Sequence, residues 1–280
     1  MRYLLLAAVA ALAIPATAQA ATTKYLGTQG TITYSTATTP VGASGFGNFS
    51  RVTTQVTYDT VTDTYTVRDT GNPLTTSSFG PADISSSTTN FTNYSRTSGA
   101  TTETFRLLNQ SGANTLIVLN YVTYGQWRRS TATATGANVN DTYVIFGTKT
   151  PSANLPHSGS ASYNTILDGT FVNKDGAYAV SGTGTFTANL GSGSISYSST
   201  ATGTPEAGGA GISFGTMTGS GSIAFNSASF KGNGSFNGNG YAMDLLGNFF
   251  GPNYEEIGGT FWLRSTKAVG GTGTGAIVGN

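Results

Sequence analysis

The sequence contains no cysteine, one histidine and few charged residues. Without a thiol in 280 residues, the chain can form no disulfide, cysteine zinc site, thiol nucleophile or cysteine lipid anchor. Charged residues make up 9% of the chain, and the formal net charge is +1. Because phosphate binding needs a concentrated basic face, this balance argues against nucleic acid as a partner.

Long hydrophobic runs are also missing, apart from one at the amino end. Residues 1–20 begin with Arg2, continue with an apolar stretch too short for a membrane span, and end in Ala18-Gln19-Ala20. This pattern predicts a secretory signal peptide, with an uncleaved anchor as the alternative. We expect an exported protein without a lipid anchor or a transmembrane span in the mature chain. It would be secreted, periplasmic or at the outer-membrane surface.

Helical patterns are almost absent, and short alternating runs between turn residues predict an all-β protein. In the amino-terminal part, the expected strands are residues 31–34, 54–58, 64–68, 102–108, 115–123 and 143–146. The second and third of these form one predicted hairpin, and the fourth and fifth form another. The connector that follows carries Pro151 and Pro156. Proline has no backbone N–H to donate and a fixed φ, so this segment is not expected inside a β-sheet. We therefore expect a β-rich domain at residues 21–150 and a linker at residues 151–157.

Eight further strands are predicted in the carboxyl-terminal part. They are residues 160–167, 178–190, 194–199, 213–225, 229–236, 241–250, 257–263 and 268–278. Short, evenly spaced antiparallel strands are typical of a sandwich or barrel. In residues 229–236, Phe230 and Phe236 share one face with Gly232 and Gly234, which suits a tightly packed interior. An eight-stranded barrel is just wide enough to be filled by its own side chains, so we expect a filled barrel at residues 158–280.

One motif near the carboxyl end resembles a known family. Residues 251–261 read GPNYEEIGGTF and follow Phe249-Phe250. This string resembles the signature of the transferrin-binding protein B-like barrel, as do residues 184–197 and 268–271. The resemblance implies an eight-stranded barrel preceded by a "handle" domain. It implies a mainly structural role for the motif residues Gly251, Pro252, Glu255, Glu256, Gly258, Gly259 and Phe261.

The resemblance also implies a function, because members of this group are surface or secreted proteins that bind host iron carriers, complement factors, haem or haemoglobin. We therefore expect a non-enzymatic, monomeric binding protein that captures haem, an iron carrier or another protein. The chain departs from the best-known members in having one lobe and no lipid-bearing cysteine. A structural or adhesive envelope protein is the alternative. An outer-membrane barrel is disfavoured because Ser, Thr and Gly occupy both strand faces.

Candidate site residues are few, and we predict no catalytic residue and no metal site. His157, the only histidine, lies on the linker, where it is either simply exposed or an axial ligand for haem. Glu255 and Glu256 are expected to cap backbone donors of a turn while remaining in water. Tyr124, Trp127, Arg128 and Arg129 combine aromatic and cationic side chains, and we predict an exposed contact surface there.

Overall fold

The computed structural model describes residues 22–26, 29–37, 46–50, 54–69, 75–236, 240–266 and 270–280. The predicted signal peptide lies outside this part of the chain. Residues 237–239 and 267–269 also lie outside it, and residues 268 and 269 are the start of the predicted last strand. Within the described residues, no helix is long and apolar enough to span a membrane.

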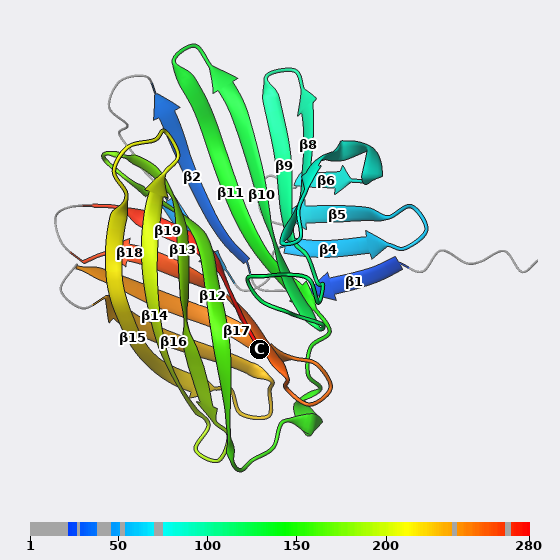
Figure 1. Ribbon diagram of the computed structural model, residues 1–280, viewed down its shortest axis with the longest axis vertical. Coiled ribbons are helices and arrows are strands. Elements are labelled where there is room, and N and C mark those ends of the chain that lie inside the picture. The colour runs from blue at the N-terminus through cyan, green and yellow to red at the C-terminus, as the bar shows by residue number, and fades with distance from the viewer. Residues whose placement is uncertain are drawn as a thin grey trace, which may run out of the picture.

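The amino-terminal region, which we call the handle, consists of two antiparallel sheets (Figure 1). The smaller sheet has the order β1 (Thr22–Leu26), β4 (Thr54–Asp59), β5 (Thr64–Asp69), β6 (Thr75–Phe79). The larger sheet has the order β3 (Phe46–Ser50), β2 (Gln29–Ala37), β11 (Gly136–Gly147), β10 (Val122–Thr133), β9 (Thr101–Leu108), β8 (Phe91–Ser98), β7 (Ile84–Ser87). A short 3-10 helix, η1 (Pro81–Asp83), precedes β7.

The two faces of the larger sheet have different partners, because successive strand residues point to opposite sides. One face buries Phe105 and Trp127 in a cluster with Val67 and Phe79 of the smaller sheet. The opposite face carries Tyr124, which packs in another cluster with the barrel residues Phe250, Ala276 and Val278. The larger sheet is therefore the middle layer between the smaller sheet and the barrel.

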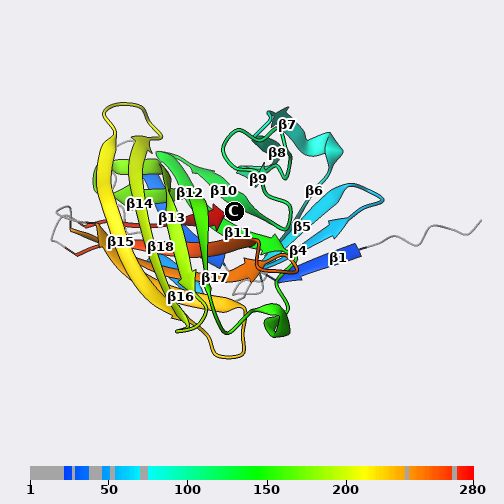
Figure 2. The ribbon, with the colours of Figure 1, turned by 60° about the horizontal axis from the view of Figure 1, so that its bottom comes forward.

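The carboxyl-terminal region is a closed barrel of eight antiparallel strands (Figure 2). A second 3-10 helix, η2 (Ser152–Asn154), lies between the handle and the barrel. The strands are β12 (Ser160–Asn173), β13 (Gly176–Asn189), β14 (Ser194–Pro205), β15 (Ile212–Ile223), β16 (Ser229–Phe236), β17 (Tyr241–Phe250), β18 (Glu256–Ser265) and β19 (Thr272–Gly279). The last strand pairs with both β18 and β12, which closes the barrel. The predicted all-β class and the predicted handle-and-barrel architecture are confirmed.

Aromatic side chains fill the barrel interior, as predicted. Phe171 and Phe214 meet edge to face with ring centroids 5.1 Å apart, and Phe186 and Phe230 lie 4.7 Å apart. All four rings are buried, so the barrel has a packed core. Gly247 lies against this core, where an added Cβ would come 2.3 Å from the Phe230 ring.

The predicted strand at residues 115–123 is wrong, because only its last two residues belong to a strand. β9 pairs with β8 and β10, and residues 109–121 form a loop between β9 and β10. The Asn114 side-chain oxygen accepts the amide hydrogens of Leu116 and Ile117. Backbone donors of this apolar segment are thus satisfied without a ladder, which removes the need for a strand.

Candidate functional site

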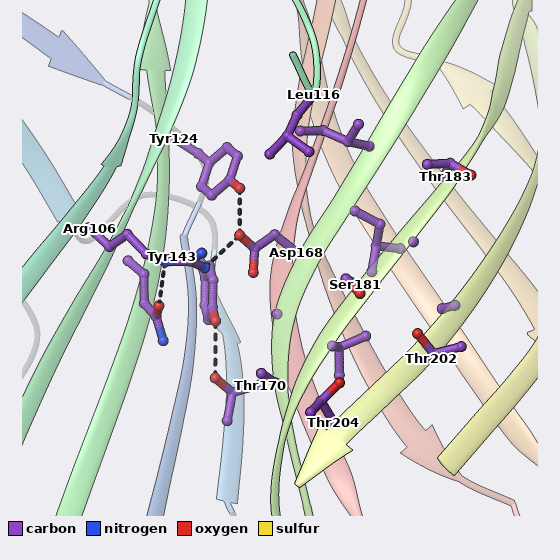
Figure 3. Close-up of a pocket in the computed structure, with 18 of the residues that line it drawn as sticks. Arg106, Leu116, Tyr124, Tyr143, Asp168, Thr170, Ser181, Thr183, Thr202 and Thr204 are labelled. Carbon is purple, nitrogen blue, oxygen red and sulfur yellow. Dashed lines mark hydrogen bonds and ion pairs between the residues drawn. The ribbon is translucent and has the colours of Figure 1, made fainter. Parts of the chain in front are cut away.

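A groove of about 600 Å³ lies between the larger handle sheet and the outer wall of the barrel at β12, β13 and β14 (Figure 3). The handle wall carries Arg106, Tyr124, Gln126, Arg128 and Tyr143, and Phe91 and Leu116 lie at its apolar part. The barrel wall presents small outward-facing side chains of alternating strand positions, namely Ala179, Ser181, Thr183, Thr200, Thr202 and Thr204. The groove therefore joins an apolar region, a charged wall and a row of hydroxyls.

Asp168 on β12 forms the first polar connection across the groove. One of its carboxylate oxygens, Oδ2, accepts hydrogen bonds from Arg106 Nη2 and the Tyr124 hydroxyl, both at 2.5 Å. Arg106 also donates to Gln126 Oε1 at 3.2 Å, and its guanidinium lies 4.5 Å from the centre of the Phe91 ring. These contacts hold Arg106 flat against the handle wall, beside the apolar part of the groove.

Arg128 forms the second connection. Its Nε and Nη2 donate to the two oxygens of the fully buried Asp141, at 2.8 and 2.6 Å. The same guanidinium binds both oxygens of Glu206, which follows β14 of the barrel, at 3.1 and 2.5 Å. Thr170 on β12 donates to Asp141 at 2.9 Å. Arg128 is thus fully engaged and holds the two walls at a set separation.

The electrostatics of the groove keep its tyrosines neutral and its arginines charged. Burial, followed by the nearby Asp168 charge, raises the pKa of Tyr124 and of Tyr143 well above the usual value. Burial alone would lower the pKa of Arg106 and Arg128. Their pKa values are nevertheless raised, because Asp168 interacts with Arg106 and Asp141 with Arg128.

A third connection joins handle and barrel at the start of β10. Glu256 accepts hydrogen bonds from the backbone amides of Asn120, Tyr121 and Val122 at 2.6, 2.9 and 2.9 Å. The prediction that this carboxylate remains in water is wrong, since only 2% of the residue is exposed. The handle covers it, and its capped donors belong to the handle. Glu255, by contrast, is exposed and caps only Asn253 within the turn.

Other residues of the 251–261 motif have local structural contacts. Gly251 has a φ of 85°, and Pro252 accepts a hydrogen bond from Asn154. Gly258 lies directly under the handle, where an added Cβ would come 2.7 Å from both Ile145 and Val122. Gly259 and Phe261 are buried, and Phe261 belongs to the barrel core. Close approach of handle and barrel at β18 thus depends on the small residue at position 258.

The structure divides the predicted contact surface between the two faces of β10. Tyr124 and Arg128 line the groove, whereas Trp127 and Arg129 lie on the opposite face, where the Arg129 guanidinium sits 5.8 Å from the Trp127 ring centre. The expected exposure of the aromatics is wrong: Trp127 is 2% exposed and Tyr124 1% exposed. His157 is exposed and is not among the groove residues.

Sequence reasoning missed Arg106, Asp168 and the hydroxyl row. Asp168 was an isolated acid in the sequence, and no spacing rule connects it to Arg106, 62 residues away. Strand alternation did contain one usable signal, because residues 124, 126 and 128 share a face that excludes residues 127 and 129. Among the described residues, no group of three or more His, Asp or Glu side chains is placed to hold a metal ion.

Comparisons with known proteins give similarity of fold only. No family model matches the chain, and no curated protein matches its sequence. The chain is similar to a double mutant of transferrin-binding protein B from Haemophilus parasuis (12% identity, 93% of this chain and 76% of that one, TM-score 0.46). It is also similar to transferrin-binding protein B from Neisseria meningitidis (10% identity, 92% and 76%, TM-score 0.35). A third similar structure is the N-lobe of lactoferrin-binding protein B from Moraxella bovis (12% identity, 67% and 79%, TM-score 0.35).

Two of these three structures are of transferrin-binding protein B, whose barrel signature residues 251–261 resemble. Identity and TM-score are low, so these likenesses assign no ligand to this chain.

Proposed function

We propose that this protein is an exported, non-enzymatic binding protein that holds an amphipathic, acidic ligand of about the size of haem in the groove between handle and barrel. The observation that carries the proposal is the groove of about 600 Å³, whose walls are joined at a fixed separation by the contacts of Asp168, Arg128 and Glu206. A preformed, partly apolar hollow with a few convergent polar groups is the usual form of a ligand site.

The ligand chemistry follows from the two ends of the groove. Phe91, Leu116 and Ile166 offer an apolar surface, and Leu116 is 48% exposed there. Beside them, Arg106 uses Nε and Nη2 for Gln126 and Asp168. Its Nη1 atom makes no hydrogen bond within the described part of the chain, so it can donate a hydrogen bond to a ligand carboxylate. An apolar body with an acidic group, as in haem, matches this pairing.

The test is a titration of the protein with haem, followed by absorbance in the Soret region. Thr202→Trp fills the groove from an exposed position on the barrel wall, and Thr218→Trp makes the same change at an exposed position on β15 outside it. We expect saturable binding that weakens at least about tenfold in Thr202→Trp and stays unchanged in Thr218→Trp. His157→Ala should bind as the unaltered protein does.

Three results would contradict the proposal. Saturable binding that is equal in Thr202→Trp and Thr218→Trp would place the ligand outside the groove. No saturable binding of haem would favour a protein partner or the structural envelope role. Loss of haem binding in His157→Ala would assign the site to the linker.

A further inference from the structure

A second hollow, of about 700 Å³, opens at the end of the handle sandwich and is separate from the groove. Asp63 and Tyr65 of the β4–β5 hairpin line one side of it. The β7–β8 hairpin and the chain after β9 also line it, with Ser87, Thr88, Thr89, Thr92, Asn109, Gln110 and Ser111.

Hydroxyl and amide groups dominate this lining. Asp63 is the single acidic residue among the lining residues, and no Arg, Lys or His is among them. The rings of Tyr65 and Tyr94 meet edge to face at 61°, with centroids 6.2 Å apart. The hollow thus lacks the cation that an acidic ligand needs. Its aliphatic lining residues are Leu107, Leu108 and Ala113, fewer than the polar ones.

Several polar atoms at the hollow have unused hydrogen-bonding capacity. The Tyr94 hydroxyl has no hydrogen bond within the described residues, although the residue is only 5% exposed. Burial, followed by the charge of Asp63, raises the pKa of Tyr94 to about 12, so the hydroxyl stays a donor. Asp63 accepts from Tyr58 through Oδ1, and Gln110 donates to Val122 through Nε2. Asp63 Oδ2 and Gln110 Oε1 therefore remain as acceptors.

The polar side of the hollow is held in place by its own hydrogen bonds. Asn109 accepts from the Thr92 hydroxyl at 2.8 Å and donates to the Thr88 carbonyl at 2.9 Å. Asn114 donates to the carbonyls of Asn109 and Asn90 at 2.9 and 3.3 Å. These bonds tie the two loops together, so little ordering entropy would be lost when a ligand binds.

We propose that this hollow is a binding site for a neutral saccharide. Sugar hydroxyls both donate and accept, which matches the Tyr94 donor and the acceptors on Asp63 and Gln110. Tyr65 is half-buried with one ring face stacked on Tyr58 at 4.6 Å, and it lines the hollow, where it can contact the apolar side of a pyranose ring. A neutral ligand leaves the Asp63 carboxylate without a like charge to repel. The inference does not depend on the function proposed for the groove.

The test uses the full protein and four neutral trisaccharides: maltotriose, cellotriose, chitotriose and mannotriose, with a sialylated trisaccharide for comparison. Saturation-transfer NMR detects contact, and calorimetry gives the Kd. Tyr94→Phe removes one hydroxyl, Asp63→Asn removes one charge, and Tyr178→Phe is a matched control in the barrel. For the best trisaccharide we expect Kd to rise about fivefold in Tyr94→Phe and about tenfold in Asp63→Asn. It should not change in Tyr178→Phe.

Three outcomes would overturn the saccharide site: no saturation transfer to any neutral trisaccharide, equal Kd values in Tyr94→Phe and Tyr178→Phe, or tighter binding of the sialylated sugar. Thr202→Trp, which fills the groove, should leave saccharide binding unchanged. The failure of one proposal can therefore be told from the failure of the other.

Discussion

Replacing Glu256 by Gln should weaken the seam between handle and barrel. The carboxylate accepts three backbone amides, and one of them, that of Val122, belongs to a residue with no exposed surface. An amide of the same shape keeps one acceptor oxygen but turns an NH2 group toward these donors. Hydrogen bonds to a charged group contribute about 1.5–3 kcal/mol, and a buried donor left unsatisfied costs about 1–3 kcal/mol.

Asn120 is exposed and Tyr121 half-buried, so water can replace the carboxylate at those two amides. The net loss in the free energy of unfolding should therefore be about 2–4 kcal/mol, which lowers Tm by on the order of 5–15 °C in a protein of this size. Glu255→Gln is the matched control, since that carboxylate is exposed and bonds only to Asn253. Its effect should stay within about 0.5 kcal/mol.

The two tryptophans make the assay specific, because Trp127 lies in the handle and Trp262 in the barrel. In the Trp262→Phe background, the fluorescence of Trp127 follows urea unfolding of the handle. In the Trp127→Phe background, the fluorescence of Trp262 follows the barrel. In Glu256→Gln, we expect the handle signal to be lost at a lower urea concentration than the barrel signal. Equal midpoints for Glu256→Gln and Glu255→Gln would refute the reasoning.

Three further substitutions test other parts of the structure. Arg128→Met leaves the fully buried Asp141 carboxylate without its cation and should lower the free energy of unfolding in urea by about 3–5 kcal/mol. Arg264→Met, at the exposed pair with Asp244, should lower it by less than about 1 kcal/mol. Similar losses in the two variants would contradict this ranking. Gly247→Ala should lower the free energy of unfolding by about 1–3 kcal/mol, because its added Cβ overpacks the barrel core. Gly112→Ala has nothing within 4 Å of its added Cβ and should be nearly neutral by the same assay. A neutral Gly247→Ala would refute the packing argument. The pKa of Tyr124 is raised in the folded state, so its contribution to the free energy of unfolding is complete below pH ~10 and declines by about 1.4 kcal/mol per pH unit above that. Tyr124→Phe should flatten the dependence of the unfolding free energy on pH in this alkaline range. An unchanged dependence would exclude Tyr124 as its source.

Barrel strands could be predicted well from the sequence because each alternates against a single core and ends at a turn residue. The predicted bounds of β16 and β17 match the structure, while β12 and β14 extend six residues further than expected. Those extensions carry Thr170 on β12 and Thr202 on β14, where the outer barrel face meets the handle or the groove. A partner from another part of the chain sets the strand length there, and local patterning does not contain that information.

The candidate site was harder to predict, because its residues come from distant strands. Residues 124–129 were interpreted as one surface, yet alternation sends Trp127 into the handle core and Arg128 to the groove. Residues 115–119 had the composition of a strand, and the hydrogen bonds of Asn114 made them a loop instead. The first error arises because neighbouring residues in a sequence are not neighbours on a sheet face. The second arises because a side chain satisfied backbone donors that a strand would otherwise pair.

The sequence by itself determined the all-β class, the eight-stranded repeat and the filled interior, since period-two patterning, turn residues and side-chain volume are local properties. It also excluded disulfides and every cysteine chemistry. Only the tertiary structure decided which ionisable groups meet. The pairs Arg106–Asp168 and Arg128–Glu206 and the capping by Glu256 each join handle and barrel across 62 to 136 residues of chain. Such contacts depend on how two surfaces dock, and docking follows from the summed shape and charge of both surfaces, which no single segment encodes.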